Sequence, residues 1–153
     1  MHMISYISES RIPFDESVPQ LRSLVSLSQR KNEALGITGV LFLRGRIFFQ
    51  VLEGPTEAVK ELFQIIRQDD RHDSIYTLLD EAISVRRFEK WTMEGFYKPH
   101  CEEHFLDAIH NLGKYFLESG SFNPSAIVSY SWRMVASMAP YRMTVPPAHI
   151  YDA

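Results

Sequence analysis

Residues 37–54 read ITGVLFLRGRIFFQVLEG, and this stretch decides the fold. Ile37 to Leu43 is a nearly continuous run of β-forming residues, which is typical of a strand buried on both faces. Arg44 and Gly45 predict a tight turn, so that residues 46–52 return beside the first run as a β-hairpin. The two strands of this hairpin are expected at the centre of a sheet.

Helices and further strands flank the hairpin on both sides. Upstream, residues 3–8 predict a strand, and the helical spacing of apolar residues predicts a helix over residues 17–34. Downstream, residues 55–69 predict a second helix, and Ile75–Ile83 and Thr92–Tyr97 predict two more strands. The order βαββαββ indicates an α+β, ferredoxin-like fold with two crossover helices on one face of a mixed sheet.

Two more helices are predicted after the sheet. The apolar residues of 102–118 fall on one helical stripe, and residues 124–138 form a second apolar helix. A helical hairpin this apolar must cover something, and the free face of the sheet is the expected partner. We therefore divide the chain into a sheet domain, residues 1–98, and a C-terminal two-helix cap with an irregular tail, residues 99–153.

Composition limits the classes of function. The 153 residues are 45% hydrophobic and 23% charged with a formal net charge of −3, which is typical of an ordinary soluble globular domain. This charge argues against nucleic acid as a partner, and no apolar run is long enough to cross a membrane. Cys101 is the single cysteine, which excludes an internal disulfide and suits a reducing compartment. We expect a cytoplasmic protein.

Two polar residues stand out because they are unusual groups to place in a core. Tyr6 lies on the first expected strand, and Gln50 lies in the apolar run FFQVLEG. A buried amide without a hydrogen bond costs about 1–3 kcal/mol, and a phenol beside it would supply one partner. A phenol gives up an electron most easily when its proton leaves too, and an amide can exchange donor and acceptor by rotating. Taken alone, Tyr6 also fits a strand tyrosine whose hydroxyl reaches the rim.

Residues in separate segments together resemble the BLUF family, the blue-light sensors that use FAD: Tyr6, Asn32, Gln50 and the triplet Trp91-Thr92-Met93. The resemblance covers roughly residues 3–97, and the helical hairpin resembles the cap of short, stand-alone members. It implies FAD between the two crossover helices, electron and proton donation by Tyr6 and a hydrogen-bond rearrangement at Gln50. It also implies a sensor, not an enzyme, which forms a homo-oligomer and signals to a separate downstream protein.

The resemblance further implies flavin contacts on both crossover helices. Asn32, and Ser28 one turn earlier, would bond the polar edge of the ring, near Lys31, which stands where other members carry histidine or asparagine. Leu24 and Ile66 would sandwich the ring. The stretch near the phosphate side would contribute Arg67, Asp69, Arg71 and His72. Simpler interpretations are a helix-end asparagine, ordinary core packing and a solvated helix end.

Trp91 and Met93 match the tryptophan and methionine of the segment that relays the light signal in the family. Strand alternation predicts that both side chains lie on one face of the sheet. An indole and a flexible thioether could exchange places near Gln50 with little loss of packing. Two core residues on an edge strand would show the same spacing.

Other chemistry is weakly represented in the sequence. His100, Cys101 and His104 resemble a metal-binding fragment but lack a fourth ligand at tetrahedral spacing, so we expect no metal site. No phosphate-binding loop or nucleophile motif is present. Two alternatives remain: a flavin-free ferredoxin-like regulator that binds a ligand or partner in the same cleft, and a flavin-dependent redox enzyme. Two helices flanking the ring argue against the enzyme.

Overall fold

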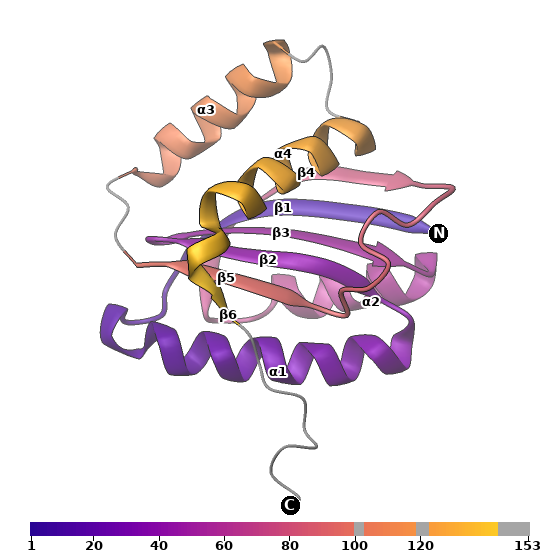
Figure 1. The fold of residues 1–153 in the computed structure, drawn as a ribbon, viewed down its shortest axis with the longest axis horizontal. Coiled ribbons are helices and arrows are strands. Elements are labelled where there is room, and N and C mark those ends of the chain that lie inside the picture. Colours follow the sequence, from indigo (N-terminus) through magenta and orange to yellow (C-terminus); the bar gives the residue numbers. More distant parts are fainter. Residues whose placement is uncertain (100–102, 119–122, 144–153) are drawn as a thin grey trace, which may run out of the picture.

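The computed structural model describes residues 1–99, 103–118 and 123–143, and within them one mixed sheet forms the middle layer (Figure 1). Its strands are β1 (His2–Ser10), β2 (Thr38–Arg44), β3 (Ile47–Gly54), β4 (His72–Ala82), β5 (Glu94–Lys98) and β6 (Arg142–Met143). They lie in the order β4-β1-β3-β2-β5-β6. Neighbouring strands are antiparallel except for β2 and β5, which run parallel.

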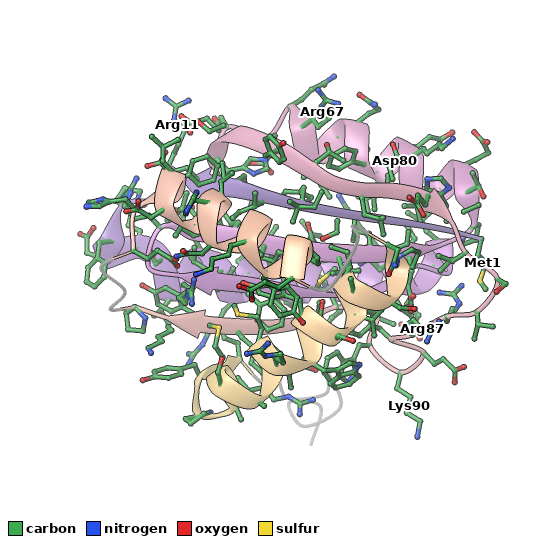
Figure 2. All side chains as sticks on the ribbon, turned by 90° about the horizontal axis from the view of Figure 1, so that it is seen from above. Met1, Arg11, Arg67, Asp80, Arg87 and Lys90 are labelled. Atoms are coloured by element: carbon green, nitrogen blue, oxygen red, sulfur yellow. The ribbon has the colours of Figure 1, made fainter. Side chains whose placement is uncertain are left out.

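Helices cover both faces of this sheet. On one face lie α1 (Ser17–Leu35) and α2 (Thr56–Arg67), and on the other lie α3 (Phe105–Glu118) and α4 (Pro124–Met138) (Figure 1). Seen from above, α3 and α4 pass over the strands as a cap (Figure 2). Short 3-10 turns, η1 (Phe14–Glu16) and η2 (Ala139–Tyr141), precede α1 and follow α4. The predicted ferredoxin-like sheet with a two-helix cap is confirmed.

Glycines fix two points of this architecture. Helix α1 ends at Gly36, whose φ of 69° is left-handed and whose N–H bonds the carbonyls of Asn32 and Glu33. In β2, a Cβ added at Gly39 would lie 2.1 Å from the Val51 carbonyl oxygen of β3. The two central strands therefore approach more closely than a larger residue at Gly39 would permit.

Strand alternation divides the core into two clusters. Tyr6, Leu41 and Phe48 pack toward α1 and α2, whereas their neighbours in the chain pack toward the cap: Ile7, Phe42 and Phe49. All eight residues of β3 are buried, because helices cover it on both sides. The near-continuous apolar run in the sequence reflects this double burial.

Two details differ from the sequence expectation. β5 begins at Glu94, two residues later than predicted, and the tail expected to be irregular contributes β6. Arg142 pairs with Glu94 at 2.8 Å, a contact between distant segments that local residue preferences do not reveal. Pro146 and Pro147 of the predicted tail lie outside the described residues. No helix in the described part of the chain has the length and apolarity to span a bilayer.

Candidate functional site

A cleft opens between α1 and α2 over the face of the sheet that the cap does not cover. It contains about 780 Å³ of atom-free space, counting the open solvent at its mouth. Except for Arg67, every residue predicted to contact flavin lines this cleft: Tyr6, Leu24, Ser28, Lys31, Asn32, Gln50, Ile66, Asp69, Arg71 and His72. Arg67 instead extends its guanidinium over Phe63, 5.7 Å from the ring centroid.

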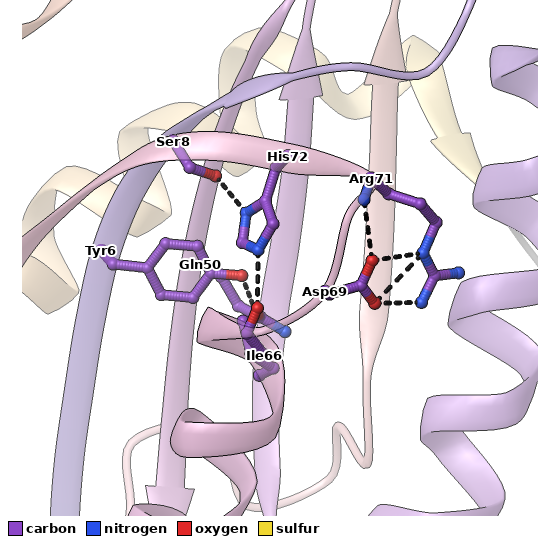
Figure 3. A network of polar contacts seen from close by, with 7 residues as sticks. All are labelled: Tyr6, Ser8, Gln50, Ile66, Asp69, Arg71 and His72. Carbon is purple, nitrogen blue, oxygen red and sulfur yellow. Dashed lines mark hydrogen bonds and ion pairs between the residues drawn. The ribbon is translucent and has the colours of Figure 1, made fainter.

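Tyr6 and Gln50 form a buried pair on the floor of the cleft. They are directly opposed on β1 and β3, and the Tyr6 hydroxyl donates to Gln50 Oε1 at 2.5 Å (Figure 3). Both side chains are buried. Burial raises the pKa of Tyr6, the Asp69 carboxylate raises it further, and Arg71 lowers it. The phenol therefore stays protonated at neutral pH, and its hydroxyl hydrogen points at the amide oxygen of Gln50.

The amide of Gln50 has unequal partners at its two ends. Its Oε1 accepts from Tyr6, while its Nε2 donates to Met93 Sδ at 3.6 Å. A thioether sulfur is a weak acceptor. Nε2 therefore keeps donor capacity that a ligand in the cleft can use.

Helix α1 holds the segment that leads into β5. Asn32, buried on α1, donates from Nδ2 to the Thr92 carbonyl oxygen at 2.8 Å. Gln29, one turn earlier, donates to the Met93 carbonyl oxygen at 2.9 Å, a contact the sequence did not indicate. Among the described residues, no donor bonds Asn32 Oδ1, so this oxygen remains available to a ligand N–H.

His72 ties the end of α2 to the sheet (Figure 3). Its Nε2 lies 2.7 Å from the Ile66 carbonyl oxygen, and its Nδ1 lies 2.7 Å from Ser8 Oγ. A carbonyl can only accept, so Nε2 donates to Ile66, and Nδ1 shares the second hydrogen bond with the serine hydroxyl. Both ring nitrogens thus bond other groups of the protein. His72 therefore lines the cleft without offering a ring nitrogen to a ligand.

Cationic groups line the cleft on both sides: Lys31 on α1, and Arg71 just after α2. Arg71 donates from its backbone N and its Nε to Asp69 Oδ1, both at 2.9 Å, and from Nη2 to Oδ2 (Figure 3). This hydrogen bonding from Arg71 lowers the pKa of Asp69 and in return raises the pKa of Arg71. Lys31 stands exposed on α1. Together these cations can attract a ligand phosphate.

Trp91 and Met93 lie on opposite sides of the sheet, so the prediction that they share a face is wrong. Met93 is buried in the cluster below α1 and α2. The Trp91 ring lies toward the cap, with its centroid 5.1 Å from that of Trp132 on α4. The reason is that residues 91–93 precede β5, so strand alternation does not apply to them.

Glu53 is a buried acid that the sequence analysis missed, and it ties β3 to the segment that leads toward β5. It is fully buried at the end of β3. Its carboxylate accepts from the backbone N–H groups of Arg87 at 2.9 Å and Phe88 at 2.5 Å, and from Thr38 Oγ1 at 3.1 Å. Phe88 in turn stacks on Trp132, with centroids 5.7 Å apart. The lone acid at the end of FFQVLEG is the signal that could have revealed it.

The polar groups of the cleft fit a flat heteroaromatic ring with a polar edge, as expected for FAD. Gln50 Nε2 offers a donor, Asn32 Oδ1 an acceptor, and Leu24 and Ile66 apolar walls. No group of three or more His, Cys, Asp or Glu in the described segments could hold a metal ion. His100 and Cys101 of the sequence fragment lie outside those segments.

Comparison with known proteins points the same way. The family profile described as "Sensors of blue-light using FAD" matches residues 1–94. The blue light- and temperature-regulated antirepressor BluF of Escherichia coli (strain K12) is 38% identical over 112 residues, covering 72% of this chain and 28% of that protein. The photoactivated adenylate cyclase subunit beta of Euglena longa is 30% identical over 135 residues, covering 83% and 15%. The chain thus spans well under half the length of these relatives.

A solved structure shares the fold over nearly the whole described chain. BlrB, described as a BLUF protein in its dark state, superposes with a TM-score of 0.65 at 29% identity. The match covers 89% of this chain and 95% of BlrB. Similarity in sequence and in fold therefore lead to one family.

Proposed function

The chain belongs to the BLUF family, the sensors of blue light that use FAD, and from this we propose that the α1–α2 cleft converts light into a rearrangement of Gln50. The protein is a blue-light photoreceptor with FAD as its cofactor. The hydrogen bond from Tyr6 to Gln50 Oε1 on the cleft floor is the observation that carries the proposal.

FAD is proposed to lie between α1 and α2. Leu24 and Ile66 would hold the ring faces, and Asn32 Oδ1 and Gln50 Nε2 would bond its polar edge. Arg71, with Lys31, would attract the phosphates. Bound there, FAD supplies absorption of blue light and, once excited, a strong oxidant.

Tyr6 is arranged to lose an electron and a proton together. Its hydroxyl already donates to Gln50 Oε1, so the proton has an acceptor in place when the ring loses an electron. With FAD bound, the electron would pass to the excited ring. Gln50 would take the phenolic proton on Oε1 and pass one from Nε2 to the edge of the ring, or would rotate its amide, and either change exchanges donor and acceptor. When the electron and proton return to Tyr6, the new arrangement of Gln50 remains as the signal.

Two routes lead from Gln50 to the cap. The first runs through the Nε2 contact with Met93, whose backbone continues to Trp91 on the other face. The second runs along β3 to Glu53, which holds Phe88 against Trp132 of α4. We propose that a change at Gln50 shifts the equilibrium position of α4 by these contacts.

The output is proposed to act on a separate protein, with residues 1–98 as the sensor and residues 99–153 as the cap that signals. The chain itself is then a sensor and not an enzyme. The related antirepressor and adenylate cyclase are much longer than the matched region, so their activities are not assigned to this chain. A cytoplasmic location and self-association are part of the same proposal, and sedimentation in the dark and under light tests the latter.

An absorption spectrum before and after blue illumination tests the proposed function. The native protein should carry flavin, shift slightly to the red in light and relax in the dark. Tyr6→Phe should retain flavin but show no shift, whereas Tyr76→Phe, on an exposed β4 position, should shift normally. A normal shift in Tyr6→Phe would overturn the mechanism. Steady bleaching would favour the redox enzyme, and a colourless protein that takes up no FAD would favour the flavin-free regulator.

A further inference from the structure

A second cavity lies on the opposite face of the sheet, between the strands and the α3–α4 cap. It contains about 1020 Å³ of atom-free space, counting its open side. Its floor is made by Ile7, Phe42 and Phe49, each the chain neighbour of a residue that lines the flavin cleft. Because successive strand residues point to opposite faces, no residue lines both cavities. A ligand here would therefore touch no residue that lines the flavin cleft.

Polar groups gather at one end of this cavity. Arg44, at the end of β2, donates from Nη2 to Glu103, which precedes α3. Arg44 Nε is the one buried side-chain nitrogen or oxygen without a hydrogen-bond partner in the described chain. This Nε has almost no accessible surface and Nη2 is paired with Glu103, so Arg44 would act on a ligand in the cavity through the charge of its partly exposed guanidinium.

The charge around this end favours an anion. Arg44 and Arg133 line the cavity together with Glu103, which leaves one positive charge in excess. Arg133 is held with its guanidinium 5.2 Å from the Tyr115 ring centroid, on the same wall. A cation would meet net repulsion here.

Tyr130 adds a neutral hydrogen-bond donor. It lies on α4, and its ring packs edge-on to Phe49 of the floor at 5.1 Å. Burial raises the pKa of Tyr130, so its hydroxyl keeps its proton at neutral pH. The cavity thus combines an apolar floor with two cationic groups and one hydroxyl at a single end.

We propose that this cavity binds a small monoanion with an apolar body, of the class of medium-chain carboxylates. The carboxylate would lie beside the guanidinium groups of Arg44 and Arg133 and accept from the Tyr130 hydroxyl, and the chain would lie on Ile7, Phe42 and Phe49. Such a ligand touches the sheet and both helices of the cap at once. It would therefore set how firmly the cap rests on the sheet, and so act as a second input on the cap.

Calorimetric titration of the FAD-loaded full chain with octanoate, and with 1-octanol as the uncharged probe, tests this inference. Octanoate should bind at one site, and 1-octanol at least about tenfold more weakly, because a hydrogen bond to a charged group is worth roughly one decade in affinity. The flavin absorption spectrum should stay unchanged throughout the titration.

Variants locate the site. Arg44→Met and Tyr130→Phe should each weaken octanoate binding, the first by about tenfold or more and the second by about threefold. Arg22→Met, on the exposed side of α1, should bind octanoate like the native chain and serves as the matched control. Tyr130→Phe keeps the test decisive if Arg44→Met fails to fold because Glu103 loses its partner.

Several outcomes would overturn the inference. These are equal binding of octanoate and 1-octanol, undiminished octanoate binding by Tyr130→Phe and Arg44→Met, release of flavin during the titration, or no octanoate binding at millimolar concentration. None of them touches the proposed photoreceptor function, because the light-induced shift is recorded separately on the same sample.

Discussion

The two faces of the sheet are built from alternate residues of the same strands, yet they are held in different ways. Under α1 and α2, short polar contacts fix the side chains, such as Tyr6 to Gln50 and Asn32 to Thr92. Under the cap, aromatic packing dominates, as between Trp91 and Trp132. Hydrogen bonds fix direction as well as distance, whereas ring packing tolerates sliding.

This difference suits a sensor. The polar face can hold a chromophore in one geometry and register a change at a single amide. On the aromatic face the ring contacts can slide, and the Arg44–Glu103 pair adds a directional contact between the sheet and the segment that precedes α3. Residues 86–93 connect the two faces. Glu53 accepts a hydrogen bond from the backbone near their start, and Asn32 and Gln29 donate to backbone carbonyls at their end.

The largest difference between two variants is expected at Gln50 and Phe49, which are adjacent on β3 and face opposite sides of the sheet. Gln50→Leu should retain flavin and abolish the light-induced absorption shift, because no amide remains to exchange donor and acceptor. Phe49→Leu, facing the cap, should keep the shift and lose only about 1–2 kcal/mol of unfolding free energy. Light-minus-dark spectra and urea unfolding measure both. A shift that survives in Gln50→Leu would reduce Gln50 to a core residue.

Glu53→Gln should cost about 2–3 kcal/mol of unfolding free energy. The neutral amide replaces one acceptor oxygen by a donor that faces backbone N–H groups of Arg87 and Phe88. Glu61→Gln, exposed on α2, should change stability by less than about 0.5 kcal/mol in the same urea titration. Equal stability of the two variants would mean that Glu53 does not tie the faces together.

Asn32→Ala should weaken flavin retention by about three- to tenfold, because one hydrogen bond of typical strength is lost from the polar face. Asn111→Ala, its counterpart under the cap, removes a contact with Glu103 and should leave retention unchanged. Flavin release on dilution measures this. Unchanged release in Asn32→Ala would make Asn32 only a tie to Thr92.

The smallest effect is expected at the mouth of the cleft. The pKa of Asp69 is held low by Arg71, so the unfolded chain binds more protons in acid than the folded one. The stabilisation is therefore present above about pH 4 and is lost as the pH falls through the lowered pKa. Because the pair is partly exposed, Asp69→Asn should cost less than about 1 kcal/mol at pH 7 and nothing in strong acid.

Urea unfolding across this pH range, with Asp70→Asn on the exposed neighbour as control, measures the difference. A gap between Asp69→Asn and the native chain that persists in strong acid would assign the stabilisation to another contact. The same result would remove Asp69 from the electrostatics of the cleft.

The sequence predicted the parts of the site that depend on local pattern. The βαββαββ order placed Tyr6 and Gln50 on central strands, and the helical spacing placed Asn32 and Ile66 on the two crossover helices. Their convergence in one cleft followed from the handedness of the crossovers. The sequence failed at residues 91–93, because strand alternation was applied to residues that lie before the strand begins.

By itself the sequence determined the order of the elements from β1 to α4 and the polar residues of the chromophore face, since these rest on periodicity and residue chemistry, and the resemblance of its motif residues indicated the family. Only the tertiary structure decided which way Trp91 points, where Arg67 lies, what Glu53 holds and that a second cavity exists under the cap. Each of these depends on contacts between segments far apart in the chain, and local preferences carry no information about such contacts.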